Sequence, residues 1–177
     1  LAYCAVDRAG FAAPGEILME RASLPGLKDF TQAIHEGGAH ASAQLGHAGP
    51  VASAKITGEK SLAPSRFLSP SQFTFSRAIT VPEIQQVIRK FADSAELAVE
   101  AGFDAIELHF GHLYLVSSFM SPWINKRKDE YGGSIENRSR FAREIAEAVK
   151  ERVGDSIAIT AKLSMSDDIK GSIWLDE

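Results

Sequence analysis

The stretch AGFDAIELHFGHLY, residues 101–114, decides the fold of this chain. Its apolar part, Phe103 to Leu108, predicts a buried strand of a parallel sheet. Two imidazoles and a phenol then leave the strand together, in the order His109, His112 and Tyr114. This group combines hydrogen-bond donors for an anion or a carbonyl oxygen with a proton donor. Because β/α folds place their chemistry where strands end, we expect a functional site here.

The rest of the sequence repeats this alternation of strand and helix. Thr80 and Glu83 have the spacing of a capping box, and apolar residues at helical spacing follow as far as Gly102. Strands that alternate with helices call for a parallel sheet with right-handed crossovers. The predicted strands are residues 1–6, 40–45, 103–108 and 157–163, and the predicted helices are residues 25–36, 81–101 and 135–153.

Four such strands fit either an open sheet or an arc of a (β/α)8 barrel. A complete barrel needs at least about 200 residues, and the chain has 177. Residues 46–79 contain glycine, proline and many serines, so we expect a loop with little regular structure there. Leu1 to Val6 reads as a strand already under way, and residues 174–177 read as a loop. We therefore expect a fragment of a longer protein.

The composition excludes several classes of function. The chain is 45% hydrophobic and 24% charged, as ordinary globular proteins are. No apolar run reaches the roughly 18 residues that span a bilayer, and no signal-peptide pattern opens the chain. A formal charge of −4 argues against a nucleic-acid surface, and lone Cys4 excludes an internal disulfide and a cysteine-based zinc site. We expect a cytoplasmic protein that acts on a small molecule, without a nucleic-acid or membrane partner.

Specific motifs narrow this expectation. The quoted stretch, together with DEYGGS (129–134), ENR (136–138) and QLGHAG (44–49), closely resembles the Old Yellow Enzyme family of FMN-dependent ene-reductases. The resemblance runs from about Val6 to the end of the chain. It implies an α/β fold that is part of a (β/α)8 TIM barrel, about strands 2 to 5 with their helices. Residues 1–177 would then form an incomplete FMN-binding domain, whose first strand and last, phosphate-binding strands are absent.

The resemblance also implies roles for individual residues. His109 and His112 match the pair that binds the carbonyl or nitro oxygen of the substrate over the flavin, and Tyr114 matches the proton donor. Gln44 matches the glutamine that hydrogen-bonds the pyrimidine edge of FMN, and Lys162 aligns with a basic residue near flavin N1. Two donors on one oxygen would stabilise the enolate-like charge of the transition state. A cation near N1 would favour the anionic reduced flavin.

The implied function is hydride transfer from NADH or NADPH, through FMN, to an activated alkene such as an enone. The alternative is a truncated, flavin-free homologue or a partial chain without activity of its own. Its partner would be a second copy or the missing remainder of the barrel. A different phosphate-binding barrel, such as an isomerase or aldolase, would need a catalytic lysine or glutamate at a strand end, where only Lys162 is available. His47, His109 and His112 offer three zinc ligands, but the glycine and tyrosine pattern has no need of a metal.

Some residues depart from the family pattern. Lys162 stands where arginine is common, which keeps the charge but loses the planar guanidinium. Leu113 stands where glycine usually separates the second histidine from the tyrosine, so we expect it to restrict the backbone and move Tyr114. Glu107 is expected to face a polar layer of the barrel. Residues 129–138 are expected to be structural, with a tight turn followed by a helix start.

Overall fold

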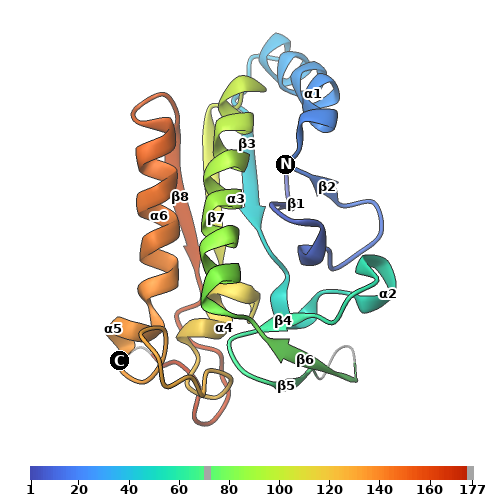
Figure 1. Cartoon of the computed structure of the whole chain (residues 1–177). Helices are drawn as coiled ribbons and strands as arrows, with labels where there is room; N and C mark the ends of the chain where they lie inside the picture. Colours follow the sequence, from blue (N-terminus) through green and yellow to red (C-terminus); the bar gives the residue numbers. More distant parts are fainter. Residues whose placement is uncertain (70–72, 175–177) are drawn as a thin grey trace.

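A computed structural model describes residues 1–69 and 73–174. Its main sheet has five strands in the order β2-β1-β3-β7-β8, and every neighbouring pair is parallel (Figure 1). The predicted parallel sheet is therefore confirmed. The strands are β1 (Cys4–Ala5), β2 (Ile17–Leu18), β3 (Ser42–Gly46), β7 (Ala105–Phe110) and β8 (Ala158–Leu163).

Helices cover one face of this sheet. α3 (Val81–Glu100) and α6 (Arg140–Val153) lie side by side over β3, β7 and β8 (Figure 1), while α1 (Leu24–Glu36) joins the first strands to β3. The predicted capping box is present: Glu83 N–H donates to the hydroxyl of Thr80, and the Glu83 carboxylate accepts from Thr80 N–H. None of the described helices is long and apolar enough to cross a membrane.

Successive side chains of β7 point alternately into the hydrophobic core and to the opposite face of the sheet. Ile106, Leu108 and Phe110 are buried and belong to the same hydrophobic cluster as residues of α3 and α6. Because successive side chains of a strand point to opposite faces, Glu107 and His109 lie on the other face, which we call the inner face. The register places Gln44 and Thr160 on either side of Glu107, and Lys162 beside His109; all lie on the inner face.

The expected loop over residues 46–79 contains regular structure, so that prediction is wrong. A small sheet lies there in the order β4-β6-β5, formed by β4 (Leu62–Ala63), β5 (Phe67–Ser69) and β6 (Thr74–Ala78), and α2 (Ala54–Thr57) precedes it. Four of the serines that suggested a loop are buried, among them Ser61 and Ser76, whose hydroxyls are 2.8 Å apart. The composition of residues 46–79 did not predict this sheet, because its stability comes from contacts between partners on neighbouring strands.

Four other elements differ from prediction. The single helix expected over residues 135–153 is two, α5 (Ile135–Arg138) and α6, with Ser139 between them. The buried Arg138 side chain donates to the carbonyl of Met120 and fixes α5 separately. Only two residues of the first predicted strand form β1, and β2 was not predicted. The short α4 (Leu115–Met120) was also missed, because all six of its residues are buried and show no amphipathic period.

Candidate active site

The two histidines and the tyrosine of the quoted stretch gather at the carboxyl end of β7. His109 Nε2 lies 3.1 Å from His112 Nδ1. The ring of Tyr114 stacks on that of His109, with centroids 4.7 Å apart and planes 22° apart. His109 is buried, Tyr114 is half-buried and His112 is exposed. The end of the sheet that carries them also carries α4 and the small β4-β6-β5 sheet (Figure 1).

The protonation of His109 follows from its surroundings. The backbone N–H of Gly111 donates to Nδ1 of His109, so a neutral ring carries its proton on Nε2. Burial lowers the pKa of His109, and the neighbouring His112 and Lys162 lower it further. His109 is therefore a neutral donor at neutral pH.

The loop that holds these rings has unusual backbone geometry. His112 and Leu113 have φ angles of 60° and 55°, in the left-handed region that favours glycine. Ser164 Oγ accepts a hydrogen bond from His112 N–H at 3.0 Å, and the hydroxyl of Ser117 donates to the carbonyl of Gly111 at 2.8 Å. These two hydrogen bonds stabilise the turn, in which leucine occupies a position that favours glycine. Sequence reasoning gave no role to Ser117.

The inner face brings the predicted flavin contacts near the histidines. Gln44 is half-buried, and its side-chain amide donates to the carboxylate of Glu107 at 2.5 Å. Lys162 is exposed on β8, directly beside His109 in the register. Glu107 lies between Gln44 and Thr160 in the register. An amide, a carboxylate, an imidazole and an ammonium group therefore share one face of the sheet.

His47 does not join the other histidines. It is 1% exposed, and its Nδ1 accepts a hydrogen bond from Gly49 N–H at 3.0 Å. Burial lowers its pKa to about 4. Within the described ranges, no group of three or more histidine, cysteine, aspartate or glutamate residues is placed to hold a metal ion.

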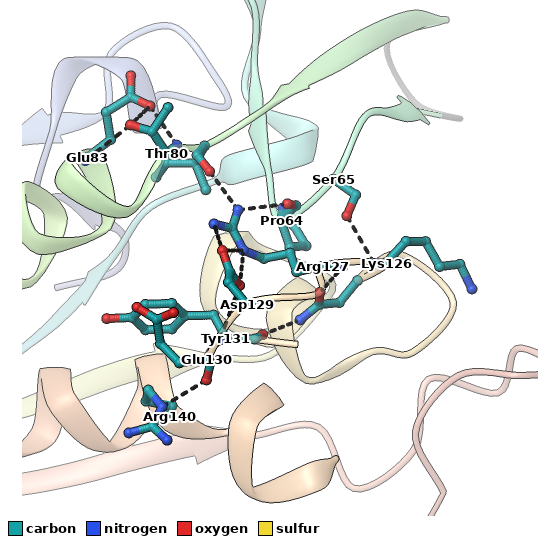
Figure 2. A network of polar contacts seen from close by, with 12 residues as sticks. Pro64, Ser65, Thr80, Glu83, Lys126, Arg127, Asp129, Glu130, Tyr131 and Arg140 are labelled. Atoms are coloured by element: carbon teal, nitrogen blue, oxygen red, sulfur yellow. Dashed lines mark hydrogen bonds and ion pairs between the residues drawn. The ribbon is translucent and has the colours of Figure 1, made fainter. Parts of the chain in front are cut away.

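The segment after α4 has a structural role, as expected (Figure 2). Arg127 contacts both carboxylate oxygens of Asp129, and its Nη1 donates to the carbonyls of Pro64 and Ile79 at 3.0 and 2.6 Å. The guanidinium holds the pKa of Asp129 below its usual range. Arg140 donates to the carbonyl of Glu130 at 2.8 Å. These bonds tie the segment to the small sheet and to α6.

Sequence reasoning also missed Tyr3. Its ring is nearly perpendicular to the rings of Tyr114 and His109, at centroid distances of 5.6 and 6.3 Å. No motif pointed to this residue, because it is separated from the others by more than 100 positions and lies in an ordinary apolar segment.

Comparisons with known proteins identify the family of this chain. Residues 2–176 match the model of the NADH:flavin oxidoreductase / NADH oxidase family. The chain belongs to this family. A 4,4'-dithiodibutanoate disulfide reductase of Rhodococcus erythropolis is 47% identical over 177 residues, which are 100% of this chain and 44% of that protein. An NADH oxidase of Thermoanaerobacter brockii is 40% identical over 87% of this chain and 24% of its own length.

Solved structures give the same result. An Old Yellow Enzyme homologue from Zymomonas mobilis superposes with a TM-score of 0.89 and 28% identity, over 97% of this chain and 51% of that one. Morphinone reductase in complex with tetrahydroNAD also gives 0.89, with 26% identity, over 97% of this chain and 52% of that one. The partial-barrel fold and the resemblance to the Old Yellow Enzyme family are confirmed, and FMN with a reduced nicotinamide is confirmed as the cofactor pair of the family. The chain spans less than half the length of the curated relatives it matches.

Proposed function

We propose that this chain contributes the substrate-binding and proton-donating half of an FMN-dependent oxidoreductase that reduces an activated alkene. The observation that carries the proposal is the cluster of His109, His112 and Tyr114, with its 3.1 Å imidazole contact and its stacked phenol. Membership of a flavin oxidoreductase family supports the reaction class. When bound, FMN supplies the hydride, which it receives from NADH or NADPH.

The side chains of the inner face are chemically suited to one edge of a flavin. The carboxamide of Gln44 has both a donor and an acceptor, which match the alternating groups of the pyrimidine edge. The ammonium group of Lys162 would offset negative charge near N1. We propose these two residues as flavin contacts, with Glu107 orienting the Gln44 amide through their hydrogen bond.

His109 and His112 would bind the carbonyl oxygen of an enone. The Nε2 proton of neutral His109 points toward Nδ1 of His112, and the proposed substrate oxygen would lie between the two rings. Donors aimed at this oxygen stabilise the negative charge that develops on it as hydride reaches the β-carbon. In the free protein the two rings are within hydrogen-bonding distance of each other, so a bound oxygen replaces that contact.

Tyr114 would deliver the proton to the α-carbon. Burial raises its pKa, and the Glu16 carboxylate raises it further, so the phenol keeps its proton at neutral pH. A protonated phenol beside the donor pair is the arrangement that general-acid catalysis requires. Hydride addition to one carbon and protonation of the next together give the saturated product.

A second candidate reaction is reduction of a disulfide, which the name of the 47% identical relative suggests. A hydride and a proton reduce an S–S bond to two thiols, and His109, His112 and Tyr114 would then donate to the departing sulfur. Both reactions use the same side chains.

An anaerobic assay of the flavin-loaded protein separates these proposals. NADH or NADPH is supplied with either 2-cyclohexenone or 4,4'-dithiodibutanoate, and reduced products are measured. Faster reduction of the enone, lost when His109 and His112 are both replaced by alanine, supports alkene reduction. His35→Ala and His40→Ala, on exposed histidines beside Asp104, are the matched control. Unchanged enone reduction in the double variant would overturn the proposal, and turnover of the disulfide alone would favour the second reaction.

A further inference from the structure

The proposed reaction gives no role to Tyr3, although this side chain contacts both Tyr114 and His109. Its ring meets Tyr114 at 84° and His109 at 79°, with centroids 5.6 and 6.3 Å away. Edge-to-face packing of this kind is a preferred arrangement of aromatic rings. Tyr3 therefore packs beside the stacked pair of His109 and Tyr114 and contacts both rings.

The hydroxyl of Tyr3 is already engaged. It donates to the carbonyl of Gly10 at 2.8 Å, and Ala48 N–H donates to the same carbonyl at 3.0 Å. Burial raises the pKa of Tyr3, which keeps this hydrogen bond in place. The hydroxyl consequently anchors the ring and is not itself a proton donor to substrate.

Two glycines allow close approaches around these rings, Gly46 to Tyr3 and Gly49 to Leu115, the residue after Tyr114. A Cβ atom at Gly46 would lie 2.6 Å from Cε2 of Tyr3, and a Cβ atom at Gly49 would lie 2.5 Å from the backbone nitrogen of Leu115. That nitrogen donates to the carbonyl of His47 at 2.9 Å. Tyr114 is thus held through its backbone by the next residue along the chain, and through its ring by Tyr3.

We propose that Tyr3 is a positioning residue that fixes the ring of Tyr114 against His109 and so sets the direction in which Tyr114 presents its hydroxyl. The catalytic consequence rests on the proposed function, in which Tyr114 is the proton donor. The contact between the three rings does not depend on that function.

Three variants isolate the ring. Tyr3→Phe keeps the ring and removes the hydrogen bond to Gly10, whereas Tyr3→Leu removes the ring. Tyr3→Met also removes the ring, with an unbranched, more flexible side chain of similar volume to leucine, and serves if the leucine variant does not fold. Phe30→Leu is the control, because it removes a 36% exposed aromatic ring from α1, whose ring neighbour is Phe103.

The first readout is nuclear magnetic resonance of the purified chain, which requires no activity. We expect Tyr3→Leu or Tyr3→Met to shift the ring resonances of Tyr114 and His109 and to weaken the nuclear Overhauser effect between them. Tyr3→Phe and the control should retain that effect. An unchanged effect in the variants without the ring would overturn the proposal.

The second readout is the steady-state and flavin-reduction kinetics of the flavin-loaded protein. Without the Tyr3 ring, kcat for alkene reduction should fall about tenfold, because a displaced donor loses its near-attack geometry. KM and the rate of flavin reduction by nicotinamide should change less than twofold, and the solvent deuterium isotope effect should rise. An equal loss in flavin reduction would overturn the positioning role. If replacing both His109 and His112 leaves alkene reduction unchanged, the proposed function fails, and the resonance measurement still decides the role of Tyr3.

Discussion

Nε2 of His109 lies 3.1 Å from Nδ1 of His112. In the free protein, the two residues predicted to bind the substrate oxygen are therefore within hydrogen-bonding distance of each other. Nδ1 of His109 already accepts from Gly111 N–H. The proton that a substrate oxygen would accept from neutral His109 therefore lies between the two rings. Binding of a substrate oxygen between the rings therefore depends on the protonation of His109.

His109 should titrate below its ordinary value of 6.5, because burial and then the charges of His112 and Lys162 disfavour the imidazolium. Replacing Lys162 by methionine removes one of these charges and should raise the pKa of His109. Titration of the imidazole nitrogen resonances measures this value. Lys170→Met, on an exposed lysine, is the control. A pKa at or above 6.5 in the unaltered chain would contradict the prediction.

Buried His47 should make stability depend on pH. Its pKa is lowered to about 4 by burial, against 6.5 in the unfolded chain, so the unfolded chain binds more protons between these values. The free energy of unfolding should consequently fall as the pH falls from about 6.5 to 4, by up to about 3 kcal/mol. Urea denaturation across this range should show a shallower fall in His47→Asn. Equal slopes in the two proteins would exclude His47 as the source.

Leu113 should be a strained position. Its φ of 55° lies in the left-handed region, where a residue other than glycine costs about 1–2 kcal/mol. Leu113→Gly should raise the free energy of unfolding by about 1 kcal/mol. Leu68→Gly, at a 51% exposed leucine of β5, should lower it. Thermal denaturation compares the variants, and a lower melting temperature for Leu113→Gly would refute the strain.

Gly49 should tolerate no side chain. An added Cβ would lie 2.5 Å from the backbone of Leu115, and the φ of Gly49 is 56°. Gly49→Ala should lower the free energy of unfolding by about 2–3 kcal/mol, since rigid backbone must move. Gly26→Ala in α1 meets no atom within 4 Å and should stabilise the chain by about 0.5–1 kcal/mol. If both replacements change the free energy of unfolding in the same direction, the close approach of Gly49 to Leu115 does not determine stability.

The sequence predicted the repeating features of the fold and the residues that cluster in short motifs. The parallel strands and α3 follow from apolar periodicity and from a local capping box at Thr80. His109, His112 and Tyr114 are near one another because one turn carries them. Tyr3 and Ser164 reach the same site only through tertiary packing, which no local pattern encodes. The small β4-β6-β5 sheet was missed for the same reason, because its serines look like loop residues until their cross-strand partners are known.

Binding of FMN by the inner face is the most direct test of the central claim. Titration of the purified chain with FMN, followed by visible absorption and quenching of flavin fluorescence, compares the unaltered chain with Gln44→Ala and Lys162→Ala. Lys170→Ala is the matched control for charge. We predict binding that each of the first two replacements weakens about tenfold, as loss of one charged or bidentate contact does, and that the control leaves unchanged. Absence of FMN binding, or equal affinity in all four proteins, would contradict the assignment of this face to the flavin.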